Sequence, residues 1–217
     1  VCVPSGNFGN IYAGFLARSM GVPIRRLILA TNENNVLEEF FTTGIYRPRS
    51  AEDTLATSSP SMDISKASNL ERFIWALLGP EVFVQRWAEL EATGTLDLRD
   101  QLPRLREEFG FVAGTSSHAD RLEAIRSVKE RSGRLIDPHT ADGVTVALRV
   151  METGFPTLVM ETAKAAKFPQ TVAEALGSEP ETPDVVADLL ARPQKVETID
   201  NEEAPLRALI EERALTR

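Results

Sequence analysis

Short apolar runs alternate with helix-like segments along this chain. The runs lie at residues 1–4, 26–31, 111–114 and 156–161, and apolar residues recur three or four positions apart in most of the segments between them. Uninterrupted apolar runs are typical of strands in parallel sheets, which are buried on both faces. Because these runs alternate with helices that can cover them, the pattern predicts an α/β fold, a parallel sheet with helices on both faces.

The alternation stops in the middle of the chain. Residues 45–67 are rich in Ser, Thr and Pro, which predicts a loop. The capping-box sequence Ser68-Asn69-Leu70-Glu71 then predicts the start of a helix. A second helix is predicted from Pro80, and a shorter one over residues 98–109, disturbed by Pro103.

These features predict the domain organisation. Residues 1–44 and 111–170 are expected to be two parts of one α/β domain, and residues 45–110 a mostly helical insertion between them. Residues 171–217 are polar and helical in pattern, and we expect them to form a helical C-terminal region.

Composition excludes several classes of partner. The net charge of −8 comes without a basic patch, which argues against nucleic acid. No run of about 18 apolar residues is present, so no membrane partner is expected. The single cysteine, Cys2, cannot form an internal disulfide, which is compatible with a reducing compartment such as the cytoplasm. The two histidines, His118 and His139, have no second ligand nearby in the sequence, and no metal site is expected.

One turn has the pattern of an anion site. It lies between the first predicted strand and the first predicted helix and reads Ser5-Gly6-Asn7-Phe8-Gly9-Asn10. The first N–H groups of a helix have no internal partner, and the helix dipole favours an anion there. Glycine lets the backbone approach a phosphate closely, and a serine hydroxyl adds a donor. The glycine spacing fits neither a Walker loop nor a dinucleotide fingerprint, and an ordinary strand–turn–helix corner remains an alternative.

A second candidate is the sequence Asp137-Pro138-His139-Thr140-Ala141. It follows a strand end predicted at residues 135–137 and precedes a helix predicted over residues 142–152. Ligands bind at the carboxyl edge of open parallel sheets, so this segment and the Ser5–Asn10 turn are expected at one site. From the residues alone, a cap of the following helix is the favoured role for Thr140.

Taken together and in this order, the motifs resemble the threonine synthase family. The resemblance covers residues 3–176 and rests on four segments. These are Pro4-Ser5-Gly6-Asn7-Phe8-Gly9-Asn10, Ser59-Pro60-Ser61-Met62-Asp63-Ile64 with Ser68-Asn69-Leu70-Glu71-Arg72, Asp137-Pro138-His139-Thr140-Ala141, and Glu161-Thr162-Ala163 with Ala166-Lys167-Phe168-Pro169.

The resemblance implies a fold type II pyridoxal-phosphate enzyme, similar in architecture to the tryptophan synthase β chain. Such an enzyme is a carbon–oxygen lyase of threonine biosynthesis that converts O-phosphohomoserine and water to threonine and phosphate. Pyridoxal 5'-phosphate serves as its electron sink. The α/β domain would then be the cofactor-binding domain. The alternatives are another fold type II phospho-lyase and a non-catalytic, anion-binding fragment.

The resemblance also implies roles for individual residues. Ser5, Gly6, Asn7, Phe8, Gly9 and Asn10 would bind the cofactor phosphate, and the Thr140 hydroxyl would face the pyridine nitrogen. The Schiff-base lysine of the family lies upstream of the phosphate loop, and no lysine of this chain matches its context. We therefore expect no catalytic residue in this chain, an N-terminal part of the same protein as its partner, and no activity of the chain alone.

Overall fold

A three-stranded parallel sheet forms the centre of the molecule. In the computed structural model, which describes residues 1–184, 188–189 and 191–214, the strands are β1 (Cys2–Pro4), β2 (Leu27–Thr31) and β5 (Phe111–Thr115). Their order across the sheet is β1-β2-β5, with Val3 opposite Leu29 and Leu29 opposite Ala113. The strands predicted at residues 1–4, 26–31 and 111–114 are confirmed.

The strand predicted at residues 156–161 is reduced to a single bridge between Val159 and Cys2. Residues 158–160 run parallel to β1, where the Cys2 N–H donates to the Leu158 carbonyl at 2.7 Å and the Met160 N–H donates to the Cys2 carbonyl at 2.9 Å. The strand end predicted at residues 135–137 was wrong, because this segment is an irregular link between two helices. Its apolar side chain Ile136 packs among those helices and not in a sheet.

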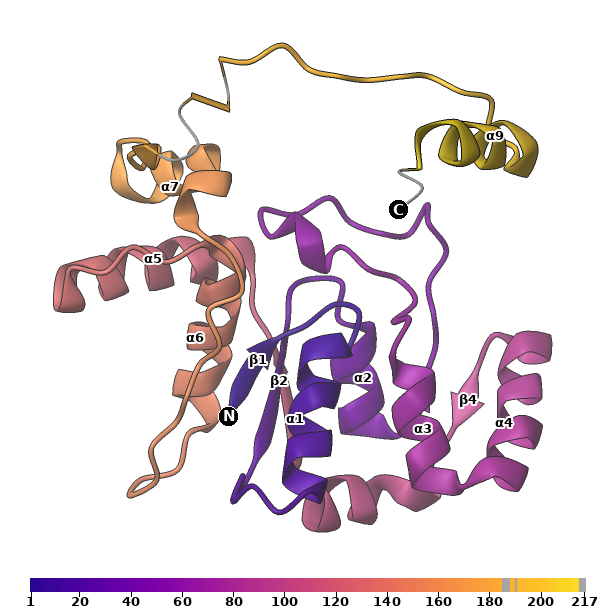
Figure 1. Cartoon of the computed structure of the whole chain (residues 1–217). Helices are drawn as coiled ribbons and strands as arrows, with labels where there is room; N and C mark the ends of the chain where they lie inside the picture. Colours follow the sequence, from indigo (N-terminus) through magenta and orange to yellow (C-terminus); the bar gives the residue numbers. More distant parts are fainter. Residues whose placement is uncertain (185–187, 190, 215–217) are drawn as a thin grey trace. The chain divides into compact units, whose positions relative to one another are not determined.

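Helices cover both faces of the sheet, as predicted. On one face lie α1 (Gly9–Ser19) and α2 (Val36–Thr43), and on the other lies α6 (Pro138–Val150) (Figure 1). Successive strand residues point to opposite faces, so Leu29 joins the core under α1 and α2, whereas Ile28 packs against α6.

Phenylalanine rings fill the core under α1 and α2. The Phe41 and Phe111 rings are stacked with centroids 4.5 Å apart, and the Phe15 and Phe73 rings meet edge to face at 5.1 Å. Phe8, from the predicted phosphate loop, is fully buried in the same cluster, 5.5 Å from Phe41. The loop is therefore anchored in the core by its own aromatic side chain.

The middle of the chain is mostly helical. Its elements are β3 (Ile45–Tyr46), η1 (Pro60–Met62), α3 (Leu70–Leu78), α4 (Pro80–Thr93), β4 (Leu96–Asp97), η2 (Arg99–Gln101) and η3 (Arg104–Glu108). The short strands β3 and β4 pair antiparallel. The helix predicted over residues 98–109 is instead split into the 3-10 helix η2 and the π-helix η3, with Pro103 between them, since proline has no N–H to donate.

The predicted capping box at Ser68 does not form. The Ser68 hydroxyl donates to the Asn7 side-chain oxygen at 3.2 Å, and the N-cap of α3 is Asn69. A capping box occurs instead at Ser117 and Asp120, where α5 (His118–Ser132) begins.

After α6 the chain forms η4 (Ala165–Lys167), α7 (Pro169–Leu176) and α9 (Glu203–Arg213). The region predicted as helical over residues 171–217 lies partly outside the described residues. The chain divides into two compact units, Val1–Glu181 and Thr182–Arg217. Within the described residues, no helix is long and apolar enough to cross a membrane.

Candidate functional site

The predicted phosphate loop connects β1 to α1 in a tight turn. The Ser5 N–H donates to the Ala30 carbonyl at 2.9 Å and so continues the sheet ladder by one residue. The Phe8 N–H donates to the Ser5 hydroxyl oxygen at 3.1 Å. Phe8 has a φ of 65°, in the left-handed region that residues other than glycine seldom adopt. Burial of its ring in the core holds the backbone in this conformation.

Several N–H groups of the loop have no partner. In the described part of the chain, the N–H groups of Gly6, Asn7, Gly9 and Asn10 donate no hydrogen bond. Gly9 and Asn10 are the first residues of α1, where the helix dipole places partial positive charge. This arrangement of free donors at the start of a helix suits an anion.

These donors border a cavity of about 290 Å³. The residues that line it come from four separate segments of the chain. They are Pro4, Ser5, Gly6, Asn7, Gly9, Asn10, Ser61, Met62, His139, Thr162 and Ala163. Each of the four motifs singled out in the sequence therefore contributes to one cavity, and none of the described residues that line it is Lys or Arg.

Two predicted residues are placed differently from the others. The ring of Phe8 lies in the core, and Phe8 is absent from the cavity lining. Thr140 is buried, and its oxygen lies 3.4 Å from the N–H of Thr162, a residue that lines the cavity. Asp137, and not Thr140, is the N-cap of α6, so the alternative role of Thr140 as the helix cap is excluded.

The buried carboxylate of Asp137 organises the start of α6. It accepts from the N–H groups of His139 at 2.9 Å and Thr140 at 3.3 Å, from the Thr140 hydroxyl, and from His139 Nδ1 at 2.8 Å. Burial alone would raise the pKa of Asp137, but the hydrogen bonds from His139 and Thr140 outweigh it and leave the pKa below its ordinary value. Asp137 is therefore ionised at neutral pH.

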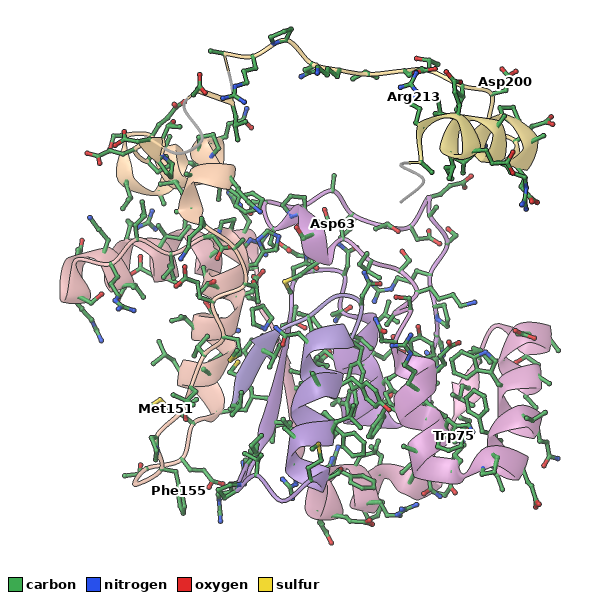
Figure 2. The ribbon with its side chains drawn as sticks, viewed as in Figure 1. Asp63, Trp75, Met151, Phe155, Asp200 and Arg213 are labelled. Atoms are coloured by element: carbon green, nitrogen blue, oxygen red, sulfur yellow. The ribbon has the colours of Figure 1, made fainter. Side chains whose placement is uncertain are left out.

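Residues 57–64, which include η1, supply Ser61 and Met62 to the cavity lining, and we call them the wall segment. Asp63 lies in this segment (Figure 2). The Asp63 carboxylate accepts from the side-chain amides of Asn32 at 2.8 Å and Asn34 at 3.0 Å, and from the Thr57 hydroxyl at 2.7 Å. Asn32 is fully buried and directly follows β2. The wall is thus fastened to the carboxyl end of a central strand, the edge at which ligands of such sheets bind.

Comparison with known proteins identifies relatives of this chain. A sequence model of the family "Threonine synthase, C-terminal" matches residues 140–210. Threonine synthase of Methylobacillus glycogenes is 50% identical over 213 residues, which cover 97% of this chain and 45% of that protein. Threonine synthase of Corynebacterium glutamicum is 51% identical, over 92% of this chain and 43% of that protein.

The chain belongs to the threonine synthase family.

Solved structures of the family share its fold. The pyridoxal-phosphate-bound threonine synthase from Brucella melitensis superposes with a TM-score of 0.85 at 36% identity, over 97% of this chain and 44% of that one. Yeast threonine synthase gives a TM-score of 0.83 at 30% identity, over 97% of this chain and 46% of that one. The predicted fold type II architecture is confirmed, and the chain spans less than half the length of the threonine synthases it matches.

One cluster beside the site was not predicted from the sequence. Arg121 on α5 is fully buried, donates to both carboxylate oxygens of Glu33 at 2.9 Å and to Asp142 at 3.0 Å, and reaches the Ser58 hydroxyl at 2.7 Å. It thereby joins α5 and α6 to the wall segment. The only signal in the sequence was a pair of ordinary charges on two predicted helices, which are usually exposed.

The pKa values of the two carboxyl groups beside Arg121 are shifted in opposite directions. Burial would raise the pKa of Glu33, but hydrogen bonds from Arg121 and His118 lower it overall. Burial raises the pKa of Asp142 to about 6, and the charge of Arg121 lowers it only in part. Arg121 donates to one carboxylate oxygen of Asp142, and the other oxygen has no hydrogen-bond partner among the described residues.

Proposed function

We propose that this chain is the cofactor-phosphate half of a threonine synthase, which as a full-length protein converts O-phosphohomoserine and water to threonine and phosphate. The observation that carries the proposal is the cavity in which the free N–H groups of Gly6, Asn7, Gly9 and Asn10 meet the segments of His139 and Thr162. Membership of the threonine synthase family supports the reaction.

The residues present fit the phosphate of pyridoxal 5'-phosphate. Four N–H donors and the dipole of α1 supply the positive potential that a phosphate needs without a cationic side chain. The hydroxyl of Ser5 accepts from the Phe8 N–H and still has its own proton to donate. The bound cofactor supplies an electron sink for carbanions of the substrate, and this chain orients it.

Thr140 remains our proposed partner of the pyridine nitrogen. Its oxygen accepts a hydrogen bond from the N–H of Thr162, a residue that lines the cavity, and its hydroxyl donates to the Asp137 carboxylate. The role is proposed on the resemblance to the family and on this placement.

Three further elements complete the proposal. The Schiff-base lysine comes from an N-terminal part of the same protein, so the chain alone has no activity. Residues 1–44 and 111–170 form the cofactor-binding domain, with residues 45–110 as a mostly helical insertion and residues 171–217 as a C-terminal region. The enzyme works in the cytoplasm, which cell fractionation would test.

The test is an absorption spectrum of the full-length protein with pyridoxal 5'-phosphate, before and after addition of O-phosphohomoserine. We expect an imine band that changes with substrate, and threonine and phosphate released in equal amounts. The chain of 217 residues is the matched control and should release neither. Phosphate release with a different amino-acid product would indicate another phospho-lyase, and absence of both cofactor binding and phosphate release would indicate a non-catalytic fragment.

A further inference from the structure

The two ring nitrogens of His139 have partners that fix where its proton lies. Nε2 lies 3.0 Å from the backbone nitrogen of Ser61, whose N–H can only donate, so Nε2 is the acceptor and carries no proton. Nδ1 lies 2.8 Å from the Asp137 carboxylate, which can only accept. His139 is therefore a neutral imidazole with its proton on Nδ1.

The ring has little freedom to turn. The His139 side chain is 3% exposed, and its ring lies 4.7 Å from the ring of Phe168 at an angle of 60°. The Asp137 carboxylate that holds Nδ1 is itself fixed as the N-cap of α6. The ring is therefore held in one orientation, with Nε2 facing the Ser61 N–H.

The hydrogen bond to Ser61 links two walls of the cavity that are 78 residues apart in the chain. Ser61 is followed by Met62, which packs against the phosphate loop so closely that a Cβ atom added to Gly6 would lie 2.9 Å from the Met62 Cα atom. Asp63 anchors the far end of this segment to Asn32 and Asn34. His139 is the anchor on the side that faces the cavity.

We propose that His139 is a positioning residue of the phosphate site, which holds Ser61 and Met62 against Gly6 and so keeps the free N–H groups of the loop at the spacing that a phosphate requires. The proposal rests on the proposed function in so far as the phosphate is that of the cofactor. It assigns to His139 no contact with the reacting atoms.

Three variants of the full-length protein test this role. His139→Phe keeps the ring against Phe168 and removes both hydrogen bonds, whereas His139→Gln keeps one acceptor and one donor. Gln85→Phe, at an exposed position of α4 that does not line the cavity, is the control. We expect His139→Phe to raise the Kd for pyridoxal 5'-phosphate about tenfold, His139→Gln to recover part of the loss, and Gln85→Phe to change the Kd less than about twofold.

A positioning role also predicts which constants change. At saturating cofactor, the kcat of His139→Phe should fall much less than its cofactor affinity, and the Kd for inorganic phosphate should rise in parallel. The proposal would be overturned if His139→Phe bound both pyridoxal 5'-phosphate and inorganic phosphate with the same Kd values as wild type. A kcat loss that persists at saturating cofactor with unchanged affinity would do the same.

Nitrogen NMR of the histidines gives a readout that does not depend on the variants folding or on catalysis. We expect the His139 signals of a neutral ring with the proton on Nδ1, and a proton on Nε2 would contradict the assignment. If the wild-type protein binds no pyridoxal 5'-phosphate, the proposed function fails, while the tautomer and the inorganic phosphate titration still decide the role of His139.

Discussion

Gly6 and Met62 lie so close together that no side chain fits between them. A Cβ atom added to Gly6 would lie 2.9 Å from the Met62 Cα atom and 2.8 Å from Ile64 Cγ1. Glycine is thus needed at position 6 because another segment of the chain passes against it, and not because of its own backbone angles. The close approach joins the phosphate loop to the wall segment that His139 holds.

Replacement of Gly6 should therefore be more harmful than replacement of Gly9. A Cβ atom at Gly9 would meet only the side-chain amide of Asn69, at 3.2 Å, which can turn away. We expect Gly6→Ala to lower the free energy of unfolding by about 1–3 kcal/mol and to weaken cofactor binding, with a clearly smaller loss of stability for Gly9→Ala. Urea unfolding and cofactor titration of both variants measure this. If Gly6→Ala and Gly9→Ala had the same free energy of unfolding, the wall segment would be able to move away from a Cβ atom at position 6 at little cost.

Arg121 should be among the least replaceable side chains outside the cavity. Arg121→Ala would leave the Glu33 and Asp142 carboxylates near each other without their shared cation, and we expect a loss of about 3–5 kcal/mol in the free energy of unfolding. Arg121→Lys keeps the charge but not the two-pronged contact with Glu33, so its loss should be intermediate. Arg86→Ala, which breaks an exposed ion pair with Glu89, is the control and should cost less than about 1 kcal/mol. A loss that small at Arg121 would contradict the burial of the cluster.

The pH dependence of stability should carry a contribution from Asp142. Its pKa of about 6 in the folded chain lies above the ordinary value of 3.8, because the carboxyl is buried. The folded state thus binds the proton more tightly than the unfolded state, so this group stabilises fully below about pH 4 and its contribution is lost as the pH rises through 6. At most about 3 kcal/mol is involved, from the size of the shift.

The measurement compares wild type with Asp142→Asn, which cannot titrate at this position. We expect the free energy of unfolding of wild type, minus that of the variant, to fall between pH 4 and pH 7. Glu33 contributes in the opposite direction, since its lowered pKa means that its stabilisation is lost as the pH falls, but it is present in both proteins. Asp100→Asn, on the surface, is the control. A difference that does not vary with pH would show that Asp142 is ionised across this range.

The sequence predicts the sheet well because its strands are buried on both faces and read as continuous apolar runs. Leu135 and Ile136 form the same kind of run but are too few to distinguish a strand from a helix link, and here Ile136 packs beside Ile125 and Ala141. A run of apolar residues indicates that a segment is buried, but it does not indicate whether the segment packs in a sheet or between helices.

Local motifs had the same limitation for the site. Ser68-Asn69-Leu70-Glu71 has the spacing of a capping box, yet a contact with Asn7 competes for the Ser68 hydroxyl. The anchoring of Asp63 by Asn32 and Asn34 joins segments about 30 residues apart, and no rule of spacing reveals it. What could be predicted were the segments that meet at the cavity, whereas the hydrogen bonds that hold them together depend on tertiary contacts.

The reactivity of the Cys2 thiol measures how readily residues 158–160 and α6 separate from β1. Burial raises the pKa of its thiol to about 12, and Sγ lies 3.2 Å from the Gly143 carbonyl oxygen of α6. Only the thiolate reacts with disulfide reagents, so at pH 8 the native thiol should react at least about a hundredfold more slowly than the thiol of the unfolded chain.

Ser50→Cys provides an internal control, because Ser50 is exposed. This variant should show one thiol equivalent that reacts at once with an aromatic disulfide reagent and a second, that of Cys2, that reacts slowly or only in urea. Cys2 is hydrogen-bonded through its backbone to residues 158 and 160, and its side chain packs under α6, so the reagent can reach it only when these contacts open. Two fast equivalents in the native protein would therefore mean that residues 158–160 and α6 separate readily from β1.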